Sequence, residues 1–576
     1  MSTPVQSKLR NSLSGGSFKK LLARLGVWPF LVYAYQISKN PKLLAEQFDV
    51  SKDLKNFHEE FGFLGNLACA NKSSKNLLVV NLSDGVFEAK MEGVLAKALE
   101  VHSGCEPVIL TNSTCYTAVR YFKVFGFKHF IFWDEFIERV KSSQDTSLWA
   151  KSSFDRLLNY QFRGVFVGRH MLSSIIRTLR HGSLDFNDPL VQKLLKQYFQ
   201  KAEKTVFAAE QLIDKIKPDT VLFLEKGYSP YGEIFDVAIN QNLNVVHWGH
   251  SHKRDSIVFK RYNRTNRHFP NFSLSPGNWA FVRKKMLWNS QKEAGFMNEI
   301  KEAYEKGSWF NRKFLLAGKK IKSPDEVRAQ LGLDKNKKTA IIFSHVLWDA
   351  TFFYGENIFK DYEDWLIETV KAAQANSRVN WIVKIHPDYI WKMKQLGPNA
   401  KPKDLLVLKA KIGELGNHIK MMEPDTDIST YSLFPVTDYC LTVRGTIGVE
   451  MACFGVPVLT AGTGRYSGMG FTIDSKNREE YLDNMRRIEE IPRMSAEQTT
   501  LARKHAFALF KLRPFRFTSF EMTQMSLERL GHLLDHNLTI DVKSSNQFTQ
   551  ARDLKQFSDW TLNFRSEEDF LNKSIE

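Results

Sequence analysis

Hydrophobic and polar positions first follow a regular order at residue 76. The apolar run 77–80 predicts a short buried strand, and a polar turn follows it. Apolar side chains over 87–99 then recur at helical spacing, and 107–110 is again a short apolar run. Strand, helix and strand in this order predict two parallel strands joined by a right-handed crossover.

The same order returns twice. In the first half we expect strands at 128–133, 220–224 and 244–247, a helix at 231–240, and mostly helix over 134–217. The stretch 253–324 is basic and aromatic with weak periodicity, which predicts loops and short helices. A second α/β series follows, with strands at 339–343, 381–385, 418–422, 439–443 and 457–460 and helices at 361–375 and 448–454.

Two α/β series predict two doubly wound, Rossmann-like lobes that face each other, with helical insertions and a C-terminal helical extension. We expect a basic helical arm at 1–75, a first lobe at 76–325 and a second lobe at 326–495. Residues 496–576 are expected to form helices and a polar tail.

Composition narrows the class of protein. Of 576 residues, 43% are hydrophobic and 25% charged, which is typical of a folded globular chain and excludes a disordered or fibrous one. Lys and Arg number 81 against 63 Asp and Glu, so the formal net charge is +18. That excess favours anionic partners: nucleotides, phospholipid headgroups, acidic saccharides or nucleic acid.

The N-terminal arm and the cysteines bear on location. Residues 17–38 interleave cations with leucine and aromatic residues, which fits a segment on an anionic membrane surface, a solvated arm with a packed helix, or a transit peptide. No apolar run reaches the roughly 18–20 residues that span a bilayer. Five scattered cysteines without a CxxC pair predict neither a disulfide framework nor a zinc finger. We expect a cytoplasmic protein, peripheral on the inner membrane if the arm binds lipid.

The stretch 439–459 is a strand, a small-residue turn, a short helix and another strand. In open α/β sheets ligands bind beyond the carboxyl ends of the strands. Glycines there let backbone N–H groups approach phosphate, an arginine adds charge, and a glutamate can grip ribose hydroxyls. A tight turn without a ligand is the alternative. The candidate residues for binding a nucleotide here are Arg444, Gly445, Thr446, Gly448 and Glu450.

His386 follows the strand at 381–385 and precedes Pro387. Proline cannot donate a ladder hydrogen bond, so the strand should stop with His386 at the edge of the sheet. There the imidazole can donate to a phosphate oxygen or protonate a leaving group, unless its role is structural. Two further strand-end loops add the candidates His345, Arg465, Tyr466 and Gly470.

Acidic residues follow the first strand. Asp84 lies in its turn, and Glu88 and Glu92 stand one helical turn apart on one face. A carboxylate at this edge can deprotonate an acceptor hydroxyl, with Glu92 ranked above Glu88. Helix-start acids stabilised by the helix dipole are the alternative.

Two groups suggest a metal, and we expect none. Asp425 to Asp427 form an acidic triplet, but Asp427 or Ser429 as a helix N-cap explains it more simply. The histidines at 247, 250 and 252 are followed by Lys253 and Arg254, which oppose a cation.

Taken together, these segments resemble bacterial capsule polysaccharide biosynthesis proteins, a group of GT-B glycosyltransferases that includes Kdo transferases. The His386-Pro387 pair is similar to the one that contacts the nucleotide in bacterial sialyl- and Kdo-transferring enzymes, and it brings Lys384 into the donor set. One departure is Arg444-Gly445, where the resemblance leads us to expect a hydroxyl-rich turn. The resembling pieces are 90–99, 345–350, 384–388, 446–452 and 465–472.

The resemblance implies a glycosyltransferase without an obligatory metal or other cofactor. Its second lobe would bind a nucleotide-activated sugar, CMP-Kdo-like or a UDP-sugar, and its first lobe an acceptor glycan, free or lipid-linked. His386, Arg444 and Arg465 would stabilise the leaving group, and Glu92 or Glu88 would be the base of an inverting reaction. A GT-B epimerase and a polyol-phosphate transferase stay open. A basic nucleic-acid-binding protein is the remote alternative, and nucleic acid is not an expected partner because no known binding motif occurs.

Overall fold

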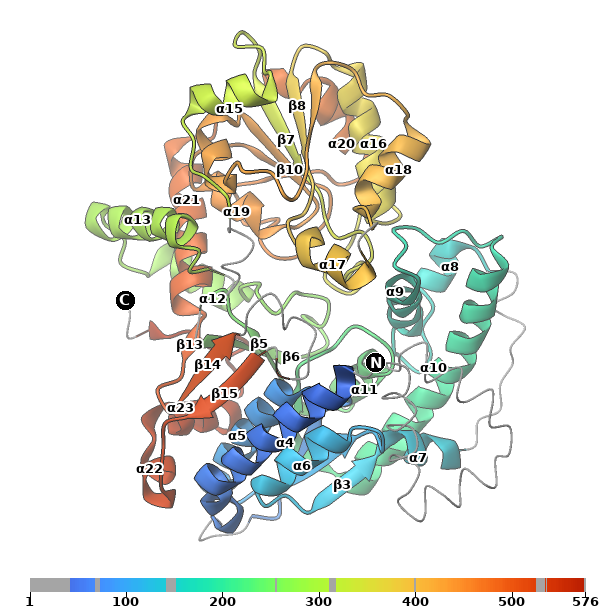
Figure 1. Ribbon diagram of the computed structural model, residues 1–576, viewed down its shortest axis with the longest axis vertical. Coiled ribbons are helices and arrows are strands. Elements are labelled where there is room, and N and C mark those ends of the chain that lie inside the picture. The colour runs from blue at the N-terminus through green and yellow to red at the C-terminus, as the bar shows by residue number, and fades with distance from the viewer. Residues whose placement is uncertain are drawn as a thin grey trace.

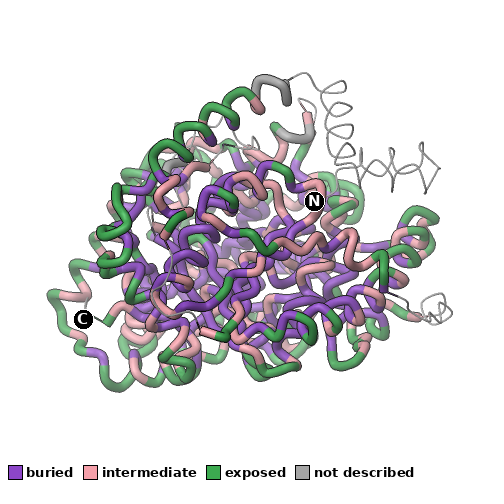
Figure 2. Tube along the Cα trace, turned by 90° about the horizontal axis from the view of Figure 1, so that it is seen from below, coloured by how far each residue is buried: buried purple, intermediate pink, exposed green. Residues whose placement is uncertain are grey.

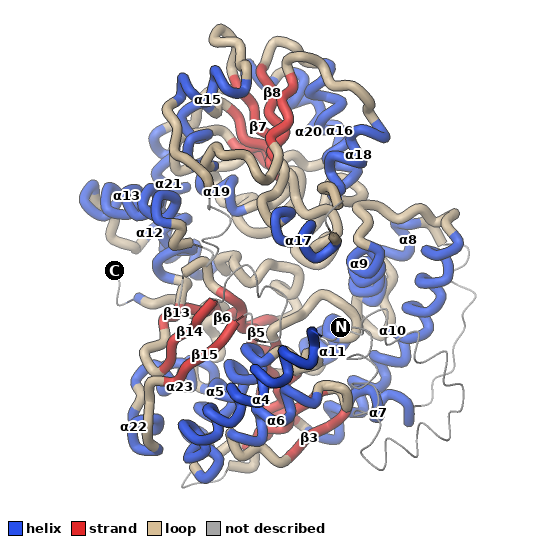
Figure 3. Tube along the Cα trace, in the orientation of Figure 1, coloured by secondary structure: helices blue, strands red, loops and turns tan. Residues whose placement is uncertain are grey.

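The computed structural model describes residues 42–67, 73–140, 152–253, 256–309, 318–397, 400–524, 534 and 536–573. The arm segment 17–38 lies outside them. Two lobes are stacked end to end, each with a central sheet flanked by helices (Figures 1 and 3). The expected fold class, two doubly wound Rossmann-like lobes, is confirmed. None of the described helices combines the length and apolar character needed to cross a membrane.

The first lobe holds a seven-stranded sheet in the order β13-β6-β5-β4-β1-β2-β3. Strands β1 to β5 are parallel, while β6 and β13 run antiparallel to their neighbours. The strand order reverses between β1 and β4, which is the switch point of this sheet. The strands are β1 (Asn76–Val80), β2 (Glu106–Thr111), β3 (His129–Phe132), β4 (Pro218–Phe223), β5 (Asn244–His250), β6 (Ser256–Tyr262) and β13 (Phe515–Arg516).

Helices cover both faces of this sheet. The helices of this half of the chain are α4 (Lys42–Phe61), α5 (Val86–Ser103), α6 (Tyr116–Val124), α7 (Trp133–Arg139), α8 (Phe154–Leu158), α9 (Val167–Leu179), α10 (Pro189–Ile216) and α11 (Tyr231–Asn240). Of these, α8 and much of α9 pack instead in the hydrophobic cluster that contains β-strand residues of the second lobe. In β1, Leu77 and Val79 belong to the core shared with α5, whereas Leu78 and Val80 belong to the core shared with α10 and α11. Burial on both faces explains why this strand is continuously apolar.

The second lobe holds six parallel strands in the order β12-β11-β10-β7-β8-β9, with its switch point between β7 and β10. The strands are β7 (Thr339–Phe343), β8 (Asn380–Lys384), β9 (Ile419–Met422), β10 (Tyr439–Thr442), β11 (Val458–Thr460) and β12 (Ile473–Asp474). The helices are α15 (Pro324–Leu331), α16 (Tyr362–Ala375), α17 (Tyr389–Leu396), α18 (Lys403–Lys411), α19 (Thr446–Ala452), α20 (Arg478–Arg486) and α21 (Ala496–Phe507).

Helices and a polar tail were expected for residues 496–576. In the structure, the C-terminal part of this segment returns to the first lobe. Strand β13 pairs with β6, and β14 (Phe520–Gln524) pairs with β15 (His536–Ile540). Helices α22 (Ser545–Gln550) and α23 (Arg552–Leu562) follow, and α23 packs on α5. Phe557 and Trp560 of α23 stack with Phe259 of β6 at 4.7 and 5.9 Å between ring centroids. Through these buried aromatic rings, the C-terminal segment contributes to the hydrophobic core of the first lobe.

The stretch predicted as loops and short helices contains strand β6, together with α12 (Pro276–Lys284) and the longer α13 (Ser290–Lys306). Every residue of β6 is buried, including Lys260 and Arg261. Lys260 Nζ lies 2.7 Å from Asp569, and Arg261 donates to the Trp560 and Phe564 carbonyls. Both cations thus have partners in the C-terminal segment. Figure 2 shows that buried residues fill the interior of the molecule, with exposed residues around its edge.

Candidate functional site

The two lobes meet through loops at the carboxyl ends of their strands. The Tyr228 hydroxyl, after β4, donates to the Asp349 carboxylate and accepts from the Ala350 N–H, each at 2.8 Å. Both partners lie in the loop after β7. The carboxyl edges of the two sheets therefore face each other, as expected from the sequence.

His345 lies at the switch point of the second sheet. Its Nε2 accepts from the Val443 N–H at 3.2 Å and lies 3.1 Å from the Thr442 hydroxyl oxygen. Because a backbone N–H donates to Nε2, the neutral ring carries its proton on Nδ1. Burial, followed by the charges of His386 and Arg444, holds the pKa of His345 well below its usual range. The ring thus fixes the turn after β10 in its neutral form.

Arg444, in that turn, is buried and forms no ion pair with a carboxylate in the described part of the chain. Its Nη2 donates to the Glu356 carbonyl at 3.0 Å and to the Asn357 side-chain oxygen. Its Nε and Nη1 are buried and meet no acceptor among the described residues. Arg465 makes no hydrogen bond or ion pair in the described part of the chain, and its guanidinium lies 5.5 Å from the Phe272 ring centre. Two arginines without carboxylate partners leave positive charge near this switch point.

Strand β8 ends at Lys384, and His386 follows two residues later at the carboxyl edge of the sheet, as expected. Its backbone N–H donates to Ser344 Oγ at 3.0 Å, and its Nδ1 accepts from the Asp388 N–H at 3.2 Å. The side chain is 35% exposed. Lys384, two residues earlier, is buried, and burial together with Lys319 lowers its pKa to about 7. His386 is therefore the accessible member of this pair.

The glycines of the turn pack against Tyr466. The Tyr466 hydroxyl donates to the Gly445 carbonyl at 2.6 Å, and the Gly445 N–H donates to Thr442 Oγ1 at 3.1 Å. A Cβ at Gly448 would lie only 2.0 Å from the Tyr466 hydroxyl oxygen. Thr446 is partly buried at the start of the seven-residue α19. These small residues therefore make room for a buried tyrosine.

Glu450 and Gly470 lie in environments that the structure explains without a ligand. The Glu450 carboxylate accepts from the Tyr304 hydroxyl of α13, and burial raises its pKa to about 7. It contacts a helix rather than open space for a ribose. Gly470 has φ of 95° in an exposed bend, where a Cβ would lie 3.9 Å from Leu501 of α21. Its left-handed backbone explains the glycine without a ligand.

The three acidic residues that follow β1 differ in how deeply they are buried. Glu92 is 1% exposed, accepts from Asn81 at 2.6 Å and from the Trp248 indole at 3.2 Å, and has its pKa raised to about 8 by burial. Glu88 is partly exposed in the first turn of α5, with its carboxylate folded toward Gly85. Asp84 accepts from the Ala118 N–H at 2.8 Å, and burial raises its pKa to about 6. Of the two glutamates, Glu88 is therefore the more accessible, whereas the sequence analysis ranked Glu92 first.

Several residues at the site escaped the sequence analysis. Thr442 was detectable, because a hydroxyl ends an otherwise apolar strand. Ser344, which holds the His386 backbone, stands next to a residue already singled out. Tyr228 and Glu356 carry no local signal, because their roles depend on contacts between the two lobes.

The acidic triplet has structural partners. Asp427 pairs with Lys322 and accepts from Gln330 at 2.9 Å. Ser429 caps the short 3-10 helix η2 (Thr430–Val436), which confirms the N-cap explanation. Within the described ranges, no three His, Cys, Asp or Glu side chains come together as metal ligands.

Comparison with known proteins gives similarities of fold. No family model matches the chain, and no curated protein does. Similar solved structures include the β-Kdo 2,4-transferase of Thermosulfurimonas dismutans KpsC, at 15% identity over 50% of this chain and 79% of that one, with a TM-score of 0.32. The β-Kdo 2,7-transferase of the same protein is similar at 16% identity over 54% and 83%, with a TM-score of 0.32. A UDP co-structure of S. aureus MnaA follows at 14% identity over 76% and 94%, with a TM-score of 0.26.

Proposed function

We propose that the protein is a glycosyltransferase that moves a sugar from a nucleotide-activated donor to an acceptor glycan in bacterial surface polysaccharide synthesis. The main support is a pair of arginines near the switch point of the second sheet, Arg444 and Arg465, neither of which forms an ion pair with a carboxylate among the residues that the structure describes. Ligands of doubly wound sheets bind at that point, and phosphate oxygens are the natural partners of guanidinium groups.

In this proposal the second lobe binds the donor phosphate. Arg444 and Arg465 neutralise the charge that grows on the leaving group as the bond between the anomeric carbon and the phosphate oxygen breaks. His386, partly exposed after β8, donates to the same oxygen. His345 positions the turn that carries Arg444, because its ring accepts the Val443 N–H.

The first lobe binds the acceptor and supplies the base. An acceptor hydroxyl attacks the anomeric carbon, its proton passes to a carboxylate, and the nucleotide leaves with the bonding electron pair. Glu88 is the proposed base of an inverting reaction, because it starts α5 at the carboxyl edge of the first sheet and is accessible. Exclusion of water between the two edges would limit hydrolysis of the donor.

Binding of CMP, UDP, GDP and CDP to the full chain, measured by calorimetry, tests the donor site. We expect one nucleotide to bind and Arg444→Ala to weaken it at least tenfold. Arg487→Ala is the matched control, since Arg487 is exposed beside α20, outside the candidate site. A chain that binds none of the four at millimolar concentration would contradict the proposal.

The reaction itself is tested with the sugar nucleotide of the base that binds. We expect transfer only when an acceptor glycan is present, and a His386→Ala protein should be slower by at least tenfold. His129→Ala, at an exposed histidine of β3, is the control. Conversion of the sugar nucleotide without acceptor would instead identify an epimerase, and consumption of a CDP-polyol would identify a polyol-phosphate transferase.

A further inference from the structure

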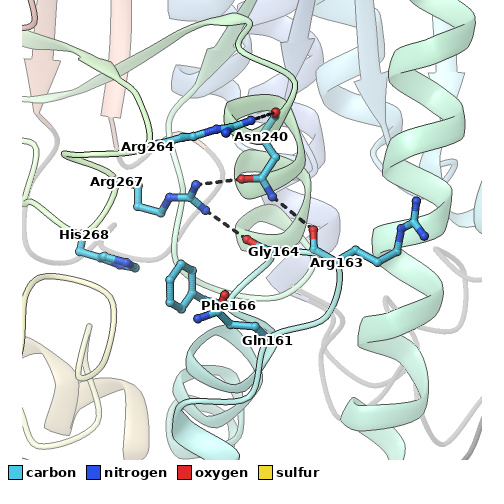
Figure 4. Close-up of a pocket in the computed structure, with 8 residues that line it drawn as sticks. All are labelled: Gln161, Arg163, Gly164, Phe166, Asn240, Arg264, Arg267 and His268. Carbon is cyan, nitrogen blue, oxygen red and sulfur yellow. Dashed lines mark hydrogen bonds between the residues drawn. The ribbon is translucent and has the colours of Figure 1, made fainter.

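A cavity of 460 Å³ lies on the first lobe, between the segment before α9, the end of α11 and the loop after β6 (Figure 4). None of the residues proposed above for donor binding or catalysis lines it. The loop after β6 belongs to the basic, aromatic stretch 253–324. Its lining residues are Gln161, Arg163, Gly164, Phe166, Asn240, Arg264, Arg267 and His268.

The cavity is positively charged. Three arginines line it, and no acidic side chain does among the described residues. Burial, followed by the charge of Arg169, lowers the pKa of His268 to about 4, so this ring is neutral at pH 7 and the charge comes from the arginines. Arg163 is paired with Glu210 of α10 at 2.8 Å and turns away from the others (Figure 4). Arg264 is exposed and donates to the Asn240 carbonyl at 2.5 Å, with no carboxylate partner in the described part of the chain. Most of its N–H groups are therefore available to a ligand.

Arg267 is held in place at the bottom of the cavity. It donates to the Asn240 side chain at 2.8 Å and to Asp236 at 3.2 Å, and it is 7% exposed. Asp236 is also bound to His170 at 3.0 Å, so the carboxylate is shared between two groups. Arg267 is thus a fixed side chain at the bottom of the cavity, while the positive charge of Arg264 has no carboxylate partner among the described residues.

An aromatic surface lies beside these charges. The Phe166 ring centre is 5.4 Å from the guanidinium carbons of both Arg169 and Arg267, and its ring meets His268 edge to face at 4.5 Å. A partly exposed ring beside arginines is suited to a ligand with an apolar face and an oxyanion. Acidic saccharides have both features.

A chain of contacts links the cavity to the candidate donor site. Arg169, which lies over Phe166, pairs with Glu356 of the second lobe, and the Glu356 carbonyl accepts from Arg444. Three successive contacts therefore connect the cavity to the candidate donor arginine. A group bound here lies on the acceptor lobe, close to where the lobes meet.

We propose that this cavity binds an oxyanion of the acceptor glycan, a sugar carboxylate or a phosphate, through Arg264 with the sugar face against Phe166. That the ligand is the acceptor glycan rests on the proposed function. That the cavity binds an oxyanion does not depend on it. The chemistry of the ligand follows from the unneutralised Arg264, the fixed Arg267 and the adjacent aromatic ring.

Isothermal titration calorimetry on the full chain tests the proposal with three probes: glucuronic acid, glucose and inorganic phosphate. We expect glucuronic acid or phosphate to bind and glucose not to bind. Arg264→Ala should weaken that binding at least fivefold, and Lys284→Ala on the exposed surface of α12 should leave it unchanged. Glucuronic acid alone identifies a carboxylate site, phosphate alone a phosphate site, and both a general oxyanion site.

Phe166→Leu separates the two parts of the site. It should weaken glucuronic acid and leave phosphate unchanged, because only the sugar has a face to place on the ring. Equal binding of glucose and glucuronic acid, binding of neither anion, or anion binding that Arg264→Ala leaves intact would overturn the proposal. Nucleotide binding should be unaffected by Arg264→Ala, so failure here is distinguishable from failure of the donor site.

Discussion

Arg169, in the first turn of α9, forms a bidentate ion pair with Glu356 in the loop after β7, with Nη1–Oε1 at 2.7 Å and Nη2–Oε2 at 2.9 Å. The pair joins the two lobes, and the Glu356 backbone carbonyl also holds Arg444. The relative position of the lobes is therefore coupled to a candidate donor-binding arginine.

Glu356→Gln should weaken nucleotide binding several-fold and change the free energy of unfolding by less than about 1 kcal/mol. The effect on stability is expected to be small because the Glu356 side chain is 59% exposed and glutamine keeps an oxygen that can still accept from Arg169, which is itself only 9% exposed. Calorimetry and urea denaturation give the two quantities. Glu210→Gln breaks a comparable pair with Arg163 on the first lobe alone and should alter neither. Equal loss of nucleotide affinity in both variants would show that the lobes are not coupled through Glu356.

Glu88→Gln should lower the rate of sugar transfer at least a hundredfold, whereas Glu92→Gln should lower it by no more than about threefold. Glu92 is enclosed by Asn81 and Trp248 and cannot reach an acceptor without rearrangement. Steady-state rates of the two variants decide between them. If Glu92→Gln is the inactive one, the base lies in the core and the surrounding elements must open.

Glu92→Gln should also change how the free energy of unfolding depends on pH. The pKa of Glu92 is raised to about 8, so the folded state prefers the protonated carboxyl, and the wild type loses stability as pH rises from 4.5 through 8. A neutral glutamine has no such loss, and the advantage of the variant should grow by about 1.4 kcal/mol per pH unit in that window. Urea denaturation at pH 5 and pH 7 measures it. A constant difference between the two pH values would contradict the burial effect.

His505 should make the protein sensitive to acid. It is buried between Trp279 and Phe471, and burial lowers its pKa to about 3. Below pH 6.5 the unfolded chain takes up a proton that the folded chain refuses, which costs about 2 kcal/mol at pH 5. In His505→Leu the fall in stability between pH 7.5 and pH 5 should be smaller by that amount. Parallel pH profiles for variant and wild type would exclude this role of His505.

Asp569→Asn should destabilise the chain by about 3–5 kcal/mol, since it leaves buried cations without their anion. Although burial opposes it, the charges of Arg513 and Lys260 hold the pKa of Asp569 well below its usual range. Denaturation by urea gives the difference in unfolding free energy. Asp559→Asn, in an exposed pair with Lys555 of the same helix, is the control and should cost no more than about 0.5 kcal/mol. A similar cost for both variants would show that the buried cluster contributes little.

The strands and their order along the chain were accessible from the sequence, because burial on both faces requires uninterrupted apolar runs such as β7 and β8. The position of His386 at the edge of the sheet was accessible for a similar reason, since Pro387 ends the strand locally. Each of these features depends on residues that are consecutive in the chain.

Only the tertiary structure decided which of the candidate residues are available to a ligand. Gly448 makes room for Tyr466, Glu450 is bound by Tyr304, and Lys260 lies in a core strand because Asp569 neutralises it. A charged or small residue has the same local pattern whether it faces a ligand or a distant side chain. The free energy of burying it depends on that partner, and the partner is brought near only when the two lobes and the C-terminal segment pack together.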